Sequence, residues 1–437
     1  MSVHIIELND RNICLRNENE ILLRSPGFAN IADKTPVFGE EARKTARLHP
    51  RQTFSQFWSQ LSLDPLVNSN NLFRHQADLA FAHLNDITAQ HALKDEVIFA
   101  VPSNYNRNQL SILLGLVQSC EFDAVGLVDM PLLMTADADY PAMTVYVDIQ
   151  LHQTVLTTFS LKDNKPTRDK VIQIPGTGLI ALHDSWVNMV TDEFIKQSRF
   201  DPHHNAETEQ YVYNQLESWL ARSLQDNEIL MEINNKGSVY QAKINRGHFE
   251  QRVRNIFGRI NSELEAMAGS NYELRLPEAD ASLPGVSLYL KNITAVRDAM
   301  LIESCLSHLD HIKGDVGSLS FTASLPQGNR KQSPVRQKQT DTVPSHILIN
   351  HRAFSLPVSV QFGPASNEES NDGIFIEASE SGAITVSLKE AHVQLKASGT
   401  GNIQINGSSA DSPAVLKLGD VINLPGASEP LQLIQVE

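Results

Sequence analysis

The sequence predicts an α/β protein with mixed sheets, followed by a small all-β sandwich. Two observations predict this fold class. Over residues 1–310, apolar runs of strand length alternate with stretches whose apolar residues recur at helical spacing. Over residues 346–437, short runs of valine, isoleucine and leucine are separated by glycine, serine, asparagine and aspartate roughly every 8–12 residues, which is typical of a β-sandwich.

The composition divides the chain into three regions. Residues 1–310 form the predicted α/β domain, residues 311–345 a polar linker, and residues 346–437 the β-sandwich domain. The core of the linker, residues 323–345, is rich in proline and glutamine and cannot bury enough apolar surface to offset its chain entropy. We expect a solvated tether. The alternative is a docking strip for an acidic partner, because this core carries four basic residues and one acid.

Within the first domain the pattern predicts strands and helices in alternation. Residues 3–8 and 13–16 are apolar runs joined by a tight polar turn, which predicts a β-hairpin. Residues 96–102 predict a buried strand, and the helix that follows over 107–120 has leucines at helical spacing. The other predicted elements are strand 124–128, a helix from 131, hairpin 143–149 with 154–162, strand 171–174, helices 181–199 and 207–223, hairpin 229–244 and one amphipathic helix over 246–267.

The composition excludes several classes of function. With 36 basic and 51 acidic residues the formal net charge is −15, so we expect no nucleic-acid partner. The three cysteines are far apart and form no zinc or disulfide pattern, so we expect no metal site. No apolar run has the length of a membrane span and no segment resembles a signal peptide, so we expect a cytoplasmic protein. The signatures of serine hydrolases, zinc proteases and P-loop enzymes are absent from the sequence.

Five stretches of the first domain carry a family resemblance. They are residues 38–43 with 49–54, residues 99–106 with Gln109, residues 122–131, residues 145–149 and residues 283–286. In this order they resemble the nucleotide-binding domain of the Hsp70 branch of the actin-like ATPase superfamily. The resemblance implies a two-lobed actin/Hsp70-like (ribonuclease H-like) domain. In that family two glycine-rich hairpin turns hold the phosphates of ATP, and acidic groups hold Mg²⁺.

The first phosphate turn departs from the family pattern. Asn9, Asp10 and Arg11 stand where the family has a glycine and two threonines. Asp10 would therefore place a negative charge where a phosphate lies in the family. Such a unit-charge pair at ~4 Å costs roughly 4 kcal/mol at an effective dielectric constant near 20. Arg11 would reverse the sign of the charge if its side chain pointed inward.

The second phosphate turn keeps the aspartate, Asp148, and loses all three glycines. Gln150, Leu151 and His152 occupy the turn, and Thr154 follows it. Side chains at these positions would fill the path of the phosphates. Asp148 and His152 also fit an acid–base pair. A hairpin turn with polar edges is the interpretation we favour.

One glycine pair remains, in Gly176-Thr177-Gly178, between the predicted strand 171–174 and the helix 181–199. It resembles a glycine-rich turn of the family, which could approach a phosphate through a helix N-terminus. A purely structural turn is the favoured alternative. The nucleotide-binding candidates that the resemblance implies are Asn9, Asp10, Arg11, Asp148, Gln150, His152, Thr154, Gly176, Thr177 and Gly178.

The C-terminal region carries a second, shorter resemblance. Residues 405–407 and 416–422 are similar to the closing strands of a forkhead-associated (FHA) sandwich. FHA domains read phosphothreonine through an early Gly-Arg and a Ser-x-x-His. Here Ser387 and His392 are spaced differently and no Gly-Arg precedes them. We therefore expect a sandwich that contacts proteins without reading phosphate.

The family's catalytic groups are also replaced, since its lysine falls near Trp58 and its glutamate on Met130. We therefore expect an Hsp70-like pseudo-ATPase, without catalytic residues or a cofactor, that acts as a scaffold or binds protein partners. The alternative is a divergent Hsp70-like chaperone or ATPase that binds ATP or ADP with Mg²⁺ and uses the β-sandwich as its partner- or substrate-binding module. A third reading is an actin-like protein that polymerises. The partner's identity and the oligomeric state stay open.

Overall fold

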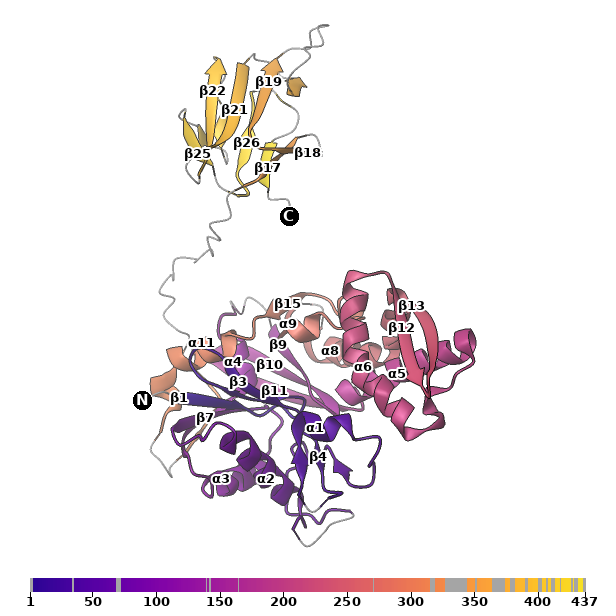
Figure 1. Ribbon diagram of the computed structural model, residues 1–437. Helices are drawn as coiled ribbons and strands as arrows, with labels where there is room; N and C mark the ends of the chain where they lie inside the picture. The colour runs from indigo at the N-terminus through magenta and orange to yellow at the C-terminus, as the bar shows by residue number, and fades with distance from the viewer. Residues whose placement is uncertain are drawn as a thin grey trace. The chain divides into compact units, whose positions relative to one another are not determined.

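The fold is known from a computed structural model (Figure 1). It describes residues 3–33, 35–67, 72–138, 140, 143–163, 165–269, 271–314, 319–326, 344–349, 352–363, 374–377, 382–389, 392–399, 403–405, 408–409, 413–416, 418–425, 427 and 431–434.

The chain splits into two compact units, Met1–Asn329 and Arg330–Glu437. The first unit extends beyond the predicted boundary at residue 310. Helix α12 (Leu309–Ile312) and strand β16 (Phe321–Thr322) both pack in it, and Leu325 is buried. Residues 311–314 and 319–326 of the predicted linker, 311–345, are thus structured, because their few apolar side chains find partners on the first unit. Residues 327–343, which hold most of the predicted tether, lie outside the described residues.

The first large sheet of unit 1 has the strand order β16-β8-β7-β1-β2-β3. Strands β1, β2 and β3 pair antiparallel, while β1, β7, β8 and β16 run parallel to one another. Their bounds are β1 Val3–Glu7, β2 Ile13–Arg16, β3 Ile21–Ser25, β7 Glu96–Val101 and β8 Asp123–Asp129. The predicted N-terminal hairpin is confirmed, and β3 extends it to three strands.

The second large sheet has the order β11-β10-β9-β14-β15. Strands β9, β10 and β11 pair antiparallel, and β9, β14 and β15 run parallel. Their bounds are β9 Met143–Ile149, β10 Gln153–Lys162, β11 Lys165–Pro175, β14 Tyr272–Pro277 and β15 Ile293–Val296. The predicted hairpin of 143–149 with 154–162 is confirmed. The predicted strand 171–174 is the end of the much longer β11.

The two large sheets share one plan. In each, the first strand, β1 or β9, starts a three-stranded antiparallel meander on one side and pairs on its other side with a parallel strand, β7 or β14. The tight turns after β1 and after β9 therefore occupy equivalent places in the two sheets. A buried cluster that includes Ile5 and Ile98 of the first sheet and Tyr146 and Phe159 of the second joins them.

Helices cover the sheets of unit 1. Helices α2 and α3 pack on the first sheet through side chains such as Leu84 and Leu113, and α4 and α11 contribute Leu133 and Leu301 to the cluster that joins the sheets. The helices and their bounds are α1 Gly39–Lys44, α2 Gln76–Ala89, α3 Arg107–Val117, α4 Met130–Met134, α5 Leu179–Ser198, α6 Ala206–Gln225, α7 Arg246–Arg252, α8 Arg254–Ala268, α9 Glu278–Ala281, α10 Val286–Tyr289 and α11 Met300–Ser307. Short elements complete the unit: β4 Ala29–Asn30, β5 Val37–Phe38, β6 Thr53–Phe54 and the 3-10 turn η1 Pro202–His204.

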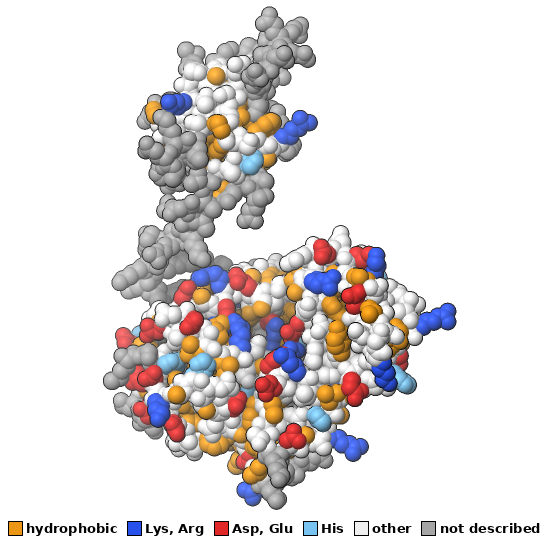
Figure 2. Space-filling view, viewed as in Figure 1, with side chains coloured by type: hydrophobic (Ala, Val, Ile, Leu, Met, Phe, Trp, Pro, Cys, Tyr) orange, Lys and Arg blue, Asp and Glu red, His pale blue; other side chains and the backbone are white. Residues whose placement is uncertain are grey.

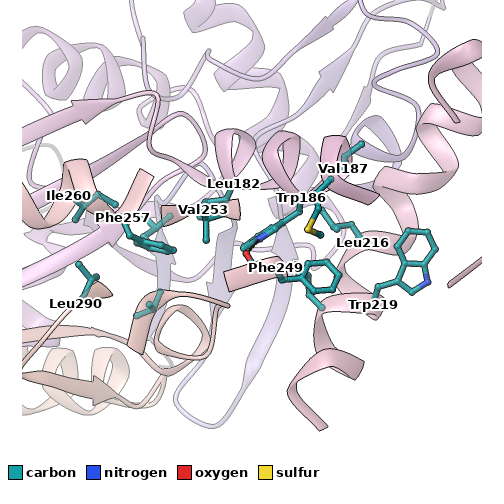
Figure 3. Packing of buried hydrophobic residues seen from close by; sticks show 14 of the residues in the cluster. Leu182, Trp186, Val187, Leu216, Trp219, Phe249, Val253, Phe257, Ile260 and Leu290 are labelled. Carbon is teal, nitrogen blue, oxygen red and sulfur yellow. Dashed lines mark hydrogen bonds between the residues drawn. The ribbon is translucent and has the colours of Figure 1, made fainter. Parts of the chain in front are cut away.

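The largest buried cluster holds helices α5 to α8 against the second sheet and the hairpin β12 (Glu228–Asn235) and β13 (Ser238–Asn245). Figure 3 shows Trp186, Phe249 and Leu216 side by side within it. The predicted single helix over 246–267 is wrong in one respect, because the chain breaks into α7 and α8 at Val253. Burial of Val253 at the break keeps the apolar face of both helices directed inward.

Unit 2 consists of two sheets, of order β18-β17-β27-β26-β23-β24 and β20-β19-β21-β22-β25. Among the described residues of this unit, every strand pairing is antiparallel except that of β19 with β20. Buried valine, isoleucine and leucine side chains from both sheets form one cluster. The strand bounds are β17 His346–Ile349, β18 Arg352–Ser355, β19 Val358–Gly363, β20 Ile374–Glu377, β21 Gly382–Lys389, β22 His392–Gly399, β23 Gln404–Ile405, β24 Ser408–Ser409, β25 Ala414–Leu416, β26 Val421–Asn423 and β27 Leu431–Ile434.

The coarse fold prediction is confirmed: an α/β region with mixed sheets precedes a region of packed β-sheets. Of the sequence that resembles an FHA domain, Asn406, Gly407 and Lys417 lie outside the described residues. Among the described residues, no helix combines the length and the apolar character that crossing a membrane requires.

Candidate functional site

The turns that follow β1 and β9 meet and are bonded to each other. The carboxylate of Asp10, in the first turn, accepts a hydrogen bond from the backbone N–H of Leu151 in the second (Oδ1···N 2.7 Å). The side-chain amide of Asn9 donates to Asp148 at the end of β9 (2.6 Å). These two bonds link the two sheets, so the predicted candidates Asn9, Asp10 and Asp148 are brought together in one place.

The start of helix α5 closes against the second turn. The backbone N–H groups of Leu179 and Ile180 donate to the carbonyl oxygens of Gln150 and Leu151, at 2.9 and 3.0 Å. A Cβ atom on Gly178 would lie 2.6 Å from the Gln150 carbonyl oxygen, so only glycine permits this approach. The first N–H groups of a helix are the ones that can bind an anion. Here two of them are occupied by the protein's own carbonyl groups.

The glycine-rich turn before α5 is held by hydrogen bonds to neighbouring residues of the same chain. Gly176 has a φ of +69°, which favours glycine, and its N–H donates to the His152 carbonyl oxygen (3.0 Å). The hydroxyl of Thr177 is buried and accepts from the Thr154 N–H (3.2 Å), while the Thr154 hydroxyl donates to the Thr177 carbonyl oxygen (2.9 Å). These reciprocal bonds fix the turn against β10 and account for the candidates Thr154, Gly176 and Thr177.

A network of side-chain amides surrounds Asp148. The Gln150 amide nitrogen donates to Asp148 Oδ2 (2.8 Å) and to the Asn104 side-chain oxygen (3.0 Å). The Gln150 oxygen accepts from Gln153 (3.0 Å). Gln150 is almost fully buried, and its donors and acceptors are used within the protein. Gln150 therefore fills the turn with a side chain whose polar groups are satisfied.

The Arg11 side chain pairs with Asp280 of helix α9. Its positive charge also opposes the rise in the pKa of Asp148. A second arginine, Arg16 on β2, pairs with Glu7 and with Asp298, each at 2.6 Å. Both arginines thus connect the first sheet to segments near β14 and β15 of the second.

Burial shifts the protonation equilibria of the acids between the turns. Desolvation raises the pKa of Asp10 to about 6, against the opposing effect of the Leu151 N–H bond. Desolvation also raises the pKa of Asp148 to about 7, and the nearby Asp10 and Glu7 charges add to this rise. The pKa of Glu7 is raised by burial as well, although Arg16 opposes the shift. Asp10 and Asp148 therefore take up protons at a higher pH than ordinary aspartates do.

Asp148 and His152 do not form an acid–base pair. The His152 ring contacts Ser55, with Nε2 2.9 Å from the carbonyl oxygen and 3.1 Å from the hydroxyl oxygen. Asp148 contacts Asn9 and Gln150 instead. Burial lowers the pKa of His152, so its neutral form is favoured. The favoured interpretation, a hairpin turn with polar edges, agrees with these contacts.

Trp58 and Met130, which the family resemblance places near its lysine and on its glutamate, are inside the hydrophobic core. Trp58 lies in a turn and is buried, and its indole N–H donates to Nδ1 of His83 (3.1 Å). Met130 begins helix α4 and is buried. Neither side chain can transfer a proton or hold a phosphate.

A cleft of about 680 Å³ lies beside the two turns. One side includes Arg11, Phe28 and residues of α1, and the other includes residues of α5 and α6. Figure 2 shows basic and acidic side chains gathered in the middle of this face of unit 1. Arg43 at the end of α1 bonds Glu217 on α6 (3.2 Å), so charged pairs cross the cleft directly.

Arg47 makes the most extensive contacts across this cleft. Its guanidinium donates to Asp184 of α5 (2.7 Å) and lies 3.9 Å above the ring centre of Tyr213 on α6. Its backbone N–H donates to the Gln210 side chain (2.6 Å). None of these residues stands out in the sequence. The sequence signal for Gln210 and Tyr213 is a row of polar side chains on one face of α6. Helical periodicity alone would place that polar face toward solvent.

Among the described residues, no group of three or more His, Cys, Asp or Glu side chains is arranged to hold a metal ion. No protein-family model matches the chain, and a search of the curated proteins found no significant match.

Proposed function

We propose that unit 1 is a degenerate Hsp70/actin-like domain, a two-lobed pseudo-ATPase that does not hydrolyse ATP and acts as a scaffold or partner-binding protein. Each large sheet would be the centre of one lobe. The shared strand plan of the two sheets supports this proposal, since a domain built from two similar lobes would contain two such sheets.

The observation that carries the proposal is the bond from the Leu151 N–H to Asp10. In the Hsp70/actin-like family that the sequence resembles, the equivalent turns direct backbone N–H groups toward the phosphates of ATP. Here a carboxylate of the same chain takes one such group, and the carbonyl oxygens of Gln150 and Leu151 take the first N–H groups of α5. A triphosphate does not fit this arrangement, because it would have to displace internal bonds and approach the buried acids Asp10 and Asp148.

The missing chemistry supports the same conclusion. Phosphoryl transfer depends on charged groups that position the γ-phosphate and the attacking water. The aligned positions hold Trp58 and Met130, both buried among apolar side chains. A fold without a phosphate-binding turn and without these charged groups can still bind other proteins through its surface.

Thermal unfolding with Mg-ATP and a phosphate-release assay test the pseudo-ATPase proposal. We expect the same Tm with and without nucleotide. A nucleotide that did bind, at a hundred times its Kd, would stabilise the folded state by about 2.7 kcal/mol and raise the Tm. We expect no phosphate release above that of the Asp148→Ala variant. A Tm increase in the wild type that disappears in both Asp148→Ala and Gly176→Val would instead support the divergent ATPase.

The scaffold role has a separate test. Partners captured on the immobilised full chain should be the same with and without Mg-ATP, since no nucleotide is expected to change the surface. A partner that leaves on addition of Mg-ATP would contradict this role and favour a nucleotide-driven chaperone.

A further inference from the structure

The cleft of unit 1 has two different ends. One face of helix α6 lines it, with residues at the spacing of a single helical stripe. These residues are Gln210, Tyr213, Asn214, Glu217, Leu220, Ala221 and Leu224. The first four are polar and the last three are apolar, so the polarity changes along the stripe.

The polar end is closed by the protein itself. Gln210 accepts a hydrogen bond from the Arg47 backbone N–H and donates one to the Arg43 carbonyl oxygen. Glu217 pairs with the Arg43 side chain, and the Asn214 amide donates to the Lys44 carbonyl oxygen. The apolar end has no such bridge among the contacts described for it. Leu220, Ala221 and Leu224 line the cleft there, and Leu283 and Pro284 also belong to its lining.

The charged groups that line the cleft are paired within the described part of the chain. Arg11 pairs with Asp280, Arg43 with Glu40 and Glu217, and Arg47 with Asp184. The lining histidines are neutral, because burial lowers the pKa of His183 to about 3 and also lowers that of His152. An ionised ligand would therefore have to break an existing ion pair to find a counter-charge.

We propose that the apolar end of this cleft binds an uncharged small molecule with an apolar body. The whole cleft, of which this end is one part, has a volume of about 680 Å³, within the range of about 300–1,000 Å³ that small-molecule sites occupy. Leu224 is 40% exposed in the free protein, and a ligand there would remove its apolar surface from water. The proposal goes beyond the pseudo-ATPase function. The five residues of the apolar end lie outside the two turns, while Arg11, Leu151 and His152 of the turns line the same cleft.

N-phenyl-1-naphthylamine, an uncharged probe that fluoresces in apolar surroundings, tests the site on the full chain. We expect saturable binding that Leu224→Arg weakens at least about tenfold, because the new charge has no partner in the apolar end. Leu230→Arg is the matched control, since Leu230 is 37% exposed on β12 and does not line the cleft. It should leave the affinity within about twofold of the wild type.

Two further measurements keep the test decisive. Ala221→Trp fills the cleft without adding charge and should also weaken binding of the probe. 8-Anilinonaphthalene-1-sulfonate, which adds one sulfonate to the same ring system, should bind more weakly than the uncharged probe. Equal loss in Leu224→Arg and Leu230→Arg, no loss in either, or tighter binding of the sulfonate would overturn the proposal. The nucleotide measurements decide the pseudo-ATPase proposal independently.

Discussion

The Oδ1 atom of Asp10 accepts the backbone hydrogen bond of Leu151 at 2.7 Å, although the two residues are 141 positions apart. Each lies in a tight turn after the first strand of a large sheet. A side chain that the family resemblance placed in the way of a phosphate is thus a structural link between two sheets.

Removing the Asp10 carboxylate should destabilise unit 1. Asp10→Ala leaves the buried Leu151 N–H without its acceptor, which we expect to cost about 1–3 kcal/mol. Asp10→Asn keeps an acceptor oxygen and should cost clearly less. Urea denaturation of both variants measures the difference. Equal losses in the two variants would mean that the bond contributes little.

The stability of unit 1 should fall as the pH rises through the range in which Asp148 ionises. Its pKa of about 7 in the folded state exceeds the ordinary value of 3.8, so the folded state holds its proton where the unfolded state has lost it. The contribution is full below pH 4 and disappears as the pH rises to about 7. Asp148→Asn removes this dependence. We therefore expect the Tm of the variant, relative to wild type, to be higher at pH 8 than at pH 5, and the opposite trend would refute the assignment.

Gly178 should tolerate no side chain. A Cβ there would lie 2.6 Å from the Gln150 carbonyl oxygen, and that oxygen is held by the Leu179 N–H. Gly178→Ala should therefore cost more than about 2 kcal/mol or prevent folding. Gly258→Ala is the control, because nothing lies within 4 Å of its Cβ and the residue is inside helix α8. It should be neutral or stabilising by up to about 1 kcal/mol on the helix-propensity scale.

Arg47 should hold the two sides of the cleft together. Arg47→Ala removes its contacts with Asp184 and Tyr213, and we expect faster hydrogen exchange in the first turns of α6 and in α1. Arg297→Ala is the control, since its exposed pair with Glu303 lies outside the cleft lining. Exposed pairs contribute little. Exchange in α6 that is no faster with Arg47→Ala than with Arg297→Ala would argue against the bridge.

Local patterns in the sequence were sufficient for many elements of the fold. The strand 13–16 and the hairpin strand 143–149 match the structure at both ends, because apolar runs between polar turns specify them. Helix α2 was missed, since its apolar positions are interrupted by His83, which is buried between Trp58 and Ser25. Strand β16 was missed because two residues pair with β8 only through the tertiary fold.

The candidate site could be predicted only in part. The family resemblance led to Asn9, Asp10 and Asp148, which the structure brings together. It could not indicate their partners, because a hydrogen bond between Asp10 and Leu151 depends on how two distant turns pack. The same reason hid the bridge of Arg47 with Asp184, whose residues are 137 positions apart and resemble ordinary surface charges in the sequence.

Isothermal titration of the full chain with Mg-ATP and with Mg-ADP tests the central claim most directly, with a known ATP-binding protein as positive control. Asp10 and the carbonyl groups of the second turn accept hydrogen bonds from the backbone N–H groups that would otherwise bind phosphate. If these bonds persist, no binding heat should appear up to about 1 mM nucleotide. That limit corresponds to a binding free energy no stronger than about −4 kcal/mol. Saturable binding with a micromolar Kd that Asp148→Ala abolishes would contradict the account, because it would show that the two turns open to accept a nucleotide.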